Sequence, residues 1–181
     1  YSLMNYADMA LGTWYPMGGM YKIVEGMTTL AQSLGVRLEL GQEVNQIQIE
    51  KGMAKAVRTR NGLVQTADVV VGGADYHHME TQLLPTNYRQ YSDRYWNSRT
   101  LAPSCLLYYI GVNKRLHCLR HHNLFFDEDF GRHAREIYET PAWPENPLFY
   151  VSAPSVTDSS VAPEGCENLF LLIPVAPGLE D

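Results

Sequence analysis

The chain has 181 residues, 45% of them hydrophobic, and a formal net charge of −6. This length allows one domain of ordinary size with its own hydrophobic core. An acidic chain without a cluster of lysines and arginines is a poor match for nucleic acid, whose phosphates require concentrated positive charge. The composition therefore predicts no nucleic-acid partner.

Three cysteines are spread over the chain, at Cys105, Cys118 and Cys166. An odd number without a C-x-x-C pair excludes a disulfide framework and a structural zinc site. No apolar run approaches the roughly 20 residues that span a bilayer, and the first residues do not form a signal peptide. Because the sequence starts at Tyr1 and not at a methionine, we expect an internal segment of a longer cytoplasmic protein.

The first 75 residues predict helix and strand in an α/β pattern. We expect the end of a helix over residues 1–11 and a loop over 12–19. Apolar residues from Ile23 to Leu34 recur at i, i+4, i+7, i+8 and i+11, which predicts an amphipathic helix that Gly35 ends.

Alternating and β-branched residues then predict strands. The strands are expected over 36–40 and 46–50, and over 53–60 and 63–66 as a hairpin with a two-residue Asn61-Gly62 turn. The continuous apolar run 69–71 is typical of a strand that is buried on both faces.

The second half predicts a mixed α+β domain, and we place the boundary near residue 75. Asp75 is expected to cap a helix. We expect helices over 75–84, 87–96 and 130–138. We expect strands over 104–112, 123–126, 148–153 and 168–175. Residues 154–165 are expected to form a loop, with Asp158 as a turn or cap residue.

Motifs of common active sites are absent from the sequence. There is no G-x-G-x-x-G, no P-loop and no G-x-S-x-G elbow. The Gly18-Gly19 pair before a helix allows close approach of another group, but its spacing favours a simple tight turn. The histidines His117, His121 and His122 are better explained as surface or hydrogen-bonded core residues than as metal ligands.

Six ordered segments together resemble the bacterial-type phytoene desaturases, within the wider flavin amine oxidase superfamily. The segments are the turn at 15–20 with its helix, Gly35 followed by Val44-x-x-Ile47, the strand motif at 67–75, Pro103 to Gly111, His121 to Asn123, and the late loop at 154–165. This resemblance extends over nearly the whole chain.

The resemblance implies a piece of a two-domain FAD-dependent oxidoreductase. Its domains would be a substrate-domain segment and loop (1–17), part of an FAD-binding-type α/β segment (18–75) and a substrate-binding α+β domain (76–181). The enzyme would desaturate a phytoene-like polyene by hydride transfer to the flavin, with loss of a proton from the adjacent carbon. We expect contact with the surface of the inner membrane, where such substrates dissolve.

The resemblance also nominates site residues, without a catalytic acid or base. Cofactor contacts are expected at Val44, Ala74 and Asp75, and the substrate cavity is expected at Tyr15, Gly18, Gly19 and Met20. The family's pyrophosphate-binding glycine motif is absent from this sequence, so we expect the chain alone to be inactive and to self-associate through an apolar patch.

Three alternatives remain open from the sequence. Related flavin enzymes, such as a carotenoid isomerase, a ketolase-like oxidase or a retinol saturase, share the same motifs. A protein similar to the GDP dissociation inhibitors would bind a prenylated partner without a flavin. A free-standing metal or redox domain rests only on the histidines and Cys118.

Overall fold

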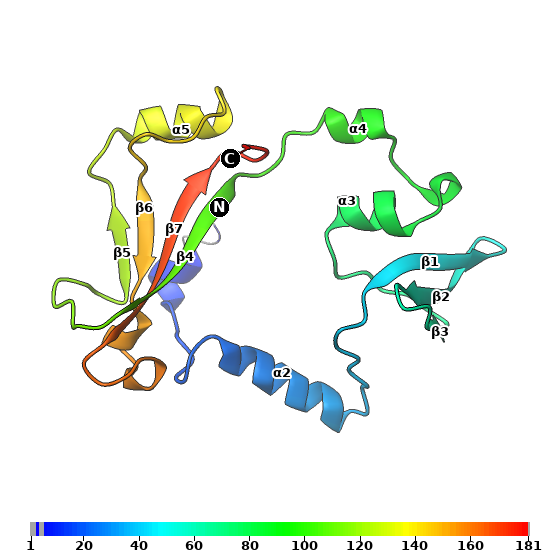
Figure 1. Ribbon diagram of the computed structural model, residues 1–181, viewed down its shortest axis with the longest axis horizontal. Coiled ribbons are helices and arrows are strands. Elements are labelled where there is room, and N and C mark those ends of the chain that lie inside the picture. The colour runs from blue at the N-terminus through cyan, green and yellow to red at the C-terminus, as the bar shows by residue number, and fades with distance from the viewer. Residues whose placement is uncertain (1–2, 4–5, 181) are drawn as a thin grey trace. The chain divides into compact units, whose positions relative to one another are not determined.

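The structure is a computed structural model and describes residue 3 and residues 6–180 (Figure 1). It contains helices and two antiparallel sheets, which confirms the mixed α/β and α+β class. The chain forms two compact units. One contains the residues up to Gly35 together with those from Leu101, and the other contains residues 36–100.

A four-stranded antiparallel sheet forms the centre of the larger unit, in the order β4-β7-β6-β5. The strands are β4 (Ser104–Val112), β5 (His122–Phe125), β6 (Phe149–Ser152) and β7 (Glu167–Val175). The two longest strands pair along their whole length, from Ser104 opposite Val175 to Val112 opposite Glu167. Figure 1 shows this pair as the green and red arrows. All four strands lie where the sequence predicts them.

The hydrophobic core of this unit is small. Val151, Ala153 and Leu169 are buried, and Leu116 and Leu119 from the loop after β4 pack against them. An ion pair between the buried Glu167 and the half-buried Arg115 closes the same end of the sheet. The carboxylate of Glu167 accepts hydrogen bonds from the Ser155 hydroxyl and from the Arg115 guanidinium.

Helix α5 (Phe130–Tyr138) follows β5, as the sequence predicts. It begins at Asp129, whose carboxylate accepts hydrogen bonds from the backbone N–H groups of Gly131 and Arg132. His133 in this helix is buried, and its ring bonds to Leu148, just before β6, and to Pro174 of β7.

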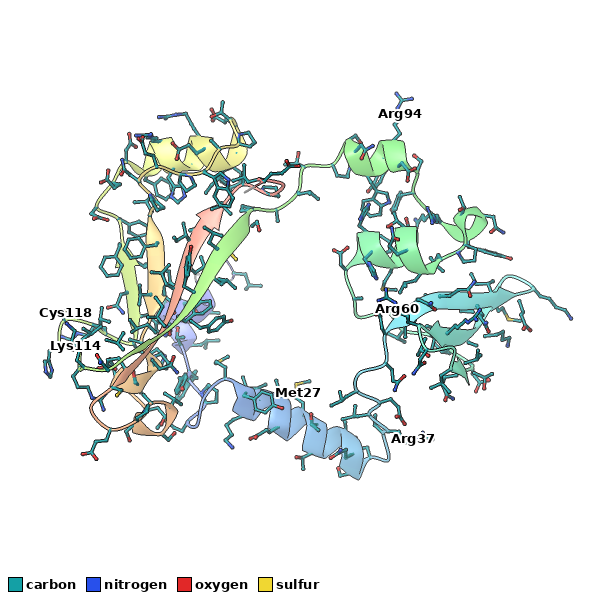
Figure 2. All side chains as sticks on the ribbon, in the orientation of Figure 1. Met27, Arg37, Arg60, Arg94, Lys114 and Cys118 are labelled. Carbon is teal, nitrogen blue, oxygen red and sulfur yellow. The ribbon has the colours of Figure 1, made fainter. Side chains whose placement is uncertain are left out.

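The N-terminal part of the same unit holds a π-helical turn (Ala7–Leu11), a loop and α2 (Tyr21–Ser33). Gly35 after α2 has φ +83°, the left-handed conformation expected of a helix C-terminus. No residue of α2 is buried, and Met27, labelled in Figure 2, has 69% of its surface exposed.

The smaller unit contains a three-stranded sheet of β1 (Val44–Glu50), β2 (Met53–Thr59) and β3 (Val64–Thr66). The predicted two-residue turn at Asn61-Gly62 is wrong. The Gly62 N–H donates to the Thr59 carbonyl and the Thr59 N–H to the Leu63 carbonyl, which makes a three-residue connection. The two-residue turn lies instead at Lys51-Gly52, where φ is +49° and +80°.

The helices of this unit are shorter than the sequence predicts. Asp75 caps α3 (Tyr76–His78) as predicted, and a π-helical turn (Met79–Leu83) continues it. The predicted helix 87–96 is broken into a 3₁₀ turn (Thr86–Tyr88) and α4 (Asp93–Asn97). The break occurs because the Gln90 and Tyr91 N–H groups donate to the buried Glu80 carboxylate instead of continuing a helix.

Two predicted strands are wrong. Residues 36–40 and 69–71 form no strand, and Val71 has 88% of its surface exposed. Apolar alternation indicates which face a strand would bury, but a strand also needs a neighbour for its backbone hydrogen bonds. Within the described residues neither segment has such a neighbour.

Candidate functional site

The predicted site begins at the Gly18-Gly19 turn that enters α2. Both glycines have positive φ, +91° and +96°, which side chains rarely tolerate. The Gly19 N–H donates to the Pro16 carbonyl at 3.1 Å, and a Cβ at Gly19 would lie 3.6 Å from a methyl carbon of Val161. The pair is therefore a tight turn that also lies close to the loop before β7.

Asp158 fixes this turn from the other end of the chain. Its buried carboxylate accepts hydrogen bonds from the Gly18 N–H at 2.5 Å and from the Ser160 hydroxyl and N–H at 2.6 and 2.9 Å. The hydrogen bond from the Ser160 hydroxyl, followed by that from Gly18, lowers the pKa of Asp158. The sequence predicts Asp158 as a cap, which is confirmed, but does not reveal its contact with Gly18.

Tyr15 lies between this carboxylate and a histidine. Burial, followed by the negative charge of Asp158, raises the pKa of the Tyr15 hydroxyl. The hydroxyl is buried and has no hydrogen-bond partner of good geometry among the described residues. The ring packs edge-on against His121, with 4.7 Å between ring centroids.

The two adjacent histidines make different contacts. His121 Nδ1 lies 2.9 Å from the Thr157 hydroxyl, and burial, followed by the neighbouring His122, lowers the pKa of His121. His122 Nδ1 lies 2.6 Å from the Tyr150 hydroxyl. In the described part of the chain no three histidine, cysteine or acidic side chains are close enough to hold a metal ion.

Tyr150 belongs to an apolar face of the four-stranded sheet. The register places Leu124, Tyr150, Leu172 and Leu107 opposite one another on β5, β6, β7 and β4. Residues opposite one another across a sheet project from the same face, so these four side chains form one row across all four strands. The adjoining pair of opposite residues, Phe170 and Tyr109, continues this apolar face, and Tyr109 has 79% of its surface exposed.

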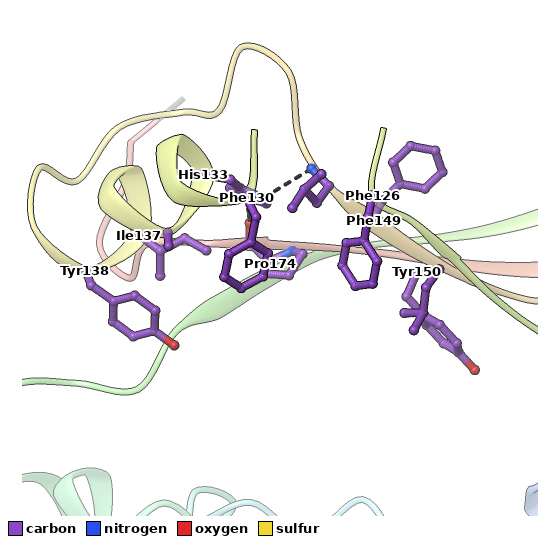
Figure 3. Close-up of a pocket in the computed structure, with 11 residues that line it drawn as sticks. Phe126, Phe130, His133, Ile137, Tyr138, Phe149, Tyr150 and Pro174 are labelled. Carbon is purple, nitrogen blue, oxygen red and sulfur yellow. Dashed lines mark hydrogen bonds between the residues drawn. The ribbon is translucent and has the colours of Figure 1, made fainter. Parts of the chain in front are cut away.

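A groove of about 300 Å³ lies beside this face, between the sheet and α5 (Figure 3). Figure 3 shows Tyr138 and Tyr150 at opposite ends of its lining. Almost all lining side chains are apolar: Leu124, Phe126, Phe130, His133, Ala134, Ile137, Tyr138, Leu148, Phe149, Tyr150 and Pro174. The sequence analysis did not identify this groove, because it is assembled from segments that lie as much as 50 residues apart.

His133 is the one histidine in this lining, and its ring nitrogens are both engaged. Nδ1 accepts a hydrogen bond from the Leu148 N–H at 3.1 Å, the dashed line in Figure 3. Nε2 therefore carries the proton and donates to the Pro174 carbonyl at 2.9 Å. His133 is a hydrogen-bonded core residue, one of the two roles that the sequence favours for the histidines.

The remaining predicted site residues belong to two separate units of the chain. Met20 directly precedes α2 and is exposed. Val44 is the first residue of β1, opposite Thr59, and Ala74 and Asp75 directly precede α3 in the smaller unit. Asp75 uses its carboxylate to cap α3, accepting the His78 N–H at 2.8 Å. The cofactor role of Val44, Ala74 and Asp75 stays a prediction.

The glycine turn offers no amide donors for a flavin's pyrophosphate, because its two N–H groups are engaged with Asp158 and Pro16. The space beside both glycines is taken up by protein side chains. A Cβ at Gly18 would lie 2.9 Å from the Lys22 side chain, and a Cβ at Gly19 would lie 3.6 Å from Val161. The place of Gly18 and Gly19 in the substrate cavity stays a prediction.

Comparisons with known proteins show the family of the chain. The model of the family "Flavin containing amine oxidoreductase" matches residues 1–163. The chain is 44% identical to a carotenoid 3,4-desaturase of Haloarcula japonica over all of its residues, which cover 36% of that protein. It is 36% identical to a zeta-carotene-forming phytoene desaturase of Myxococcus xanthus, over 97% of this chain and 33% of that protein.

A relative with a different named activity is similar over the same length. The chain is 33% identical to a 4,4'-diapolycopene oxygenase of Methylomonas, over 99% of this chain and 35% of that protein. The chain thus spans about a third of the length of the curated relatives it matches. It belongs to the flavin containing amine oxidoreductase family.

Proposed function

We propose that the protein to which this chain belongs is an FAD-dependent desaturase of a carotenoid precursor. Relatives that are similar over essentially the whole chain are named as carotenoid and phytoene desaturases. The family implies a flavin, and FAD is the form that we propose. Bound flavin would supply the hydride acceptor, while the protein supplies position and a dry, apolar surface.

The structural observation that carries this proposal is the apolar groove beside the sheet face. A polyene is a long hydrocarbon, and it gains affinity from apolar surface removed from water. The groove measures about 300 Å³. If each carbon group of the polyene takes up ~30 Å³, as a water molecule does in the liquid, the groove has room for about ten carbons. We therefore assign it to one end of the polyene, with the rest lying along the sheet face.

We propose that Tyr15, Gly18, Gly19 and Met20 border the substrate cavity, as the sequence predicts. Val44, Ala74 and Asp75 are proposed to border the cofactor. Because carotenoid precursors dissolve in the bilayer, the protein is proposed to attach to the cytoplasmic surface of the inner membrane. No helix in the described part of the chain is long and apolar enough to cross a membrane.

Pigment analysis tests this function. The full-length protein would be produced in cells that accumulate phytoene, and the extracted pigment would be examined by absorption spectroscopy and mass spectrometry. We expect long-wavelength polyene bands and products lighter by two hydrogens per new double bond. Unchanged phytoene, in cells that contain the folded protein, would contradict the proposal.

Oxygen insertion into a similar polyene is a second candidate, because the Methylomonas relative is named an oxygenase. The two are distinguished by product mass, since an oxygenase adds oxygen. The binding-protein alternative is less favoured, because the relatives reported above are named as enzymes of carotenoids.

A further inference from the structure

A continuous set of aromatic rings joins the glycine turn to the apolar face. Tyr15 packs against His121, whose ring centroid lies 4.5 Å from that of His122. His122 in turn lies parallel to the ring of Tyr150, and its Nδ1 contacts the Tyr150 hydroxyl at 2.6 Å. The His121–His122 pair therefore lies between the glycine turn at the predicted substrate cavity and the surface proposed to hold the polyene.

His122 projects from the apolar face of the sheet. The register places His122 on β5 opposite Ser152 on β6. Ser152 lies opposite Phe170 on β7, and Phe170 lies opposite Tyr109 on β4. His122 is exposed, and its Nε2 makes no hydrogen bond with any of the described residues. When Nδ1–H donates to the Tyr150 oxygen, the free lone pair is on Nε2.

Other titratable groups near this face are less suited to accept a proton. Both ring nitrogens of His133 are engaged with backbone groups. His121 lies against Tyr15 and Thr157, and Asp158 is buried beyond Tyr15. Burial, followed by the neighbouring His122, lowers the pKa of His121, so its ring is a weaker base than an ordinary histidine.

Desaturation releases one hydride and one proton from adjacent carbons, and the proton needs an acceptor in an apolar site. We propose that His122 Nε2 is this acceptor, and that Tyr150 is the positioning residue that fixes its tautomer. This proposal rests on the proposed function, with a flavin as the hydride acceptor.

The atoms and electrons of this step balance. The hydride leaves one carbon with its bonding pair for the oxidised flavin. The C–H bond of the neighbouring carbon breaks, its electron pair becomes the new π bond, and the proton bonds to the Nε2 lone pair of His122. The imidazolium keeps its Nδ1–H bond to the Tyr150 oxygen and later releases its proton to water.

The experiment compares His122→Gln and Tyr150→Phe with His117→Gln, a change at an exposed histidine outside the groove lining. It uses the purified full-length protein with bound flavin and phytoene in lipid vesicles. We expect His122→Gln to lower kcat about 100-fold, as for loss of a general base, with flavin content and KM unchanged.

A second readout does not depend on turnover. Nitrogen NMR spectra would be recorded on the substrate-free protein with isotope-labelled histidine rings. The His122 signal is the one that is missing from the spectrum of the His122→Gln variant. The proposal predicts a neutral imidazole with its proton on Nδ1, and a shift toward the other tautomer in Tyr150→Phe.

The outcomes separate this inference from the proposed function. If the wild-type protein binds no flavin or forms no new double bond, the proposed function fails. If it desaturates phytoene and His122→Gln keeps its kcat, or changes only KM, the proton-acceptor role of His122 is wrong while the function stands. A wild-type His122 with its proton on Nε2 would also overturn the inference.

Discussion

At the scale of single residues, Asp158 joins two loops whose contacting residues lie 140 positions apart. We expect Asp158→Asn to lower the Tm of the full-length protein by about 2 °C, because the amide accepts the Gly18 and Ser160 hydrogen bonds less strongly than the carboxylate. Asp127→Asn is the matched control, since Asp127 is exposed and makes no side-chain hydrogen bond within the described residues.

The stability that Asp158 contributes should depend on pH. The pKa of Asp158 is lowered in the folded protein, so the stability it contributes is present above the ordinary value of 3.8 and is lost as the pH falls through the folded-state pKa. The Tm difference between wild type and Asp158→Asn should therefore be full at neutral pH and shrink below pH 3.8. An equal difference at neutral and strongly acid pH would count against this role of the carboxylate.

His133 is expected to matter for stability, because it satisfies two backbone groups beneath α5. His133→Ala would leave the Leu148 N–H and the Pro174 carbonyl without partners, and should lower the free energy of unfolding by about 2 kcal/mol in urea. His117→Ala, at an exposed position, should change it by less than about 0.5 kcal/mol. Similar losses in both variants would show that the His133 hydrogen bonds contribute little.

The role of a single residue can be predicted from the sequence only where it depends on neighbouring residues. Residue type and local spacing are enough to identify Gly35 and Asp75, because a helix end depends on its immediate neighbours. The contacts of Asp158 with Gly18 and of His122 with Tyr150 depend on how distant segments are brought together. No local pattern encodes them, so the central contacts of the candidate site could not be predicted.

At the scale of elements, the groove beside α5 gives a direct test of polyene binding. Ala134 lines the groove, and Ala134→Leu would place a larger side chain within its space. We expect affinity for phytoene to fall about tenfold, since a few carbons of apolar contact are worth this much. The measurement is KM, or equilibrium binding to the purified full-length protein.

Ala142→Leu provides the control for this change, because Ala142 is exposed and lies outside the groove lining. It makes the same substitution without filling the groove, and should leave the affinity unchanged. Unaltered affinity in Ala134→Leu as well would place the polyene elsewhere.

Some elements follow the sequence closely, even where the strand that pairs with them is distant in the chain. The predicted strand 104–112 and helix 130–138 have the observed bounds of β4 and α5. The predicted strands 36–40 and 69–71 fail, although their apolar patterns are as clear, because the described residues offer them no strand to pair with. A pattern of apolar residues therefore predicts an element only where its partner is also present.

At the scale of the whole molecule, large apolar side chains remain exposed along α2. Met27, Leu30 and Leu34 have 69%, 61% and 75% of their surfaces exposed and share one side of the helix at i, i+3 and i+7. Exposed apolar surface of this kind favours association. We expect the chain, when produced alone, to form concentration-dependent oligomers in light scattering.

Charges on this face should reverse the association. The double variant Met27→Lys and Leu30→Glu should shift the chain toward monomer, while Gln32→Lys, at an exposed polar position of the same helix, should not. A wild-type chain that stays monomeric over a wide range of concentrations would show that the face does not drive self-association.

The central claim is that the parent protein oxidises a carotenoid precursor with its flavin. The most direct measurement mixes the purified full-length protein with phytoene in lipid vesicles without oxygen, and follows the absorption spectrum during a single turnover. We expect the oxidised-flavin band to bleach at the same rate as new polyene bands rise. A flavin that stays oxidised while phytoene is present and bound, or a protein that contains no flavin, would contradict it.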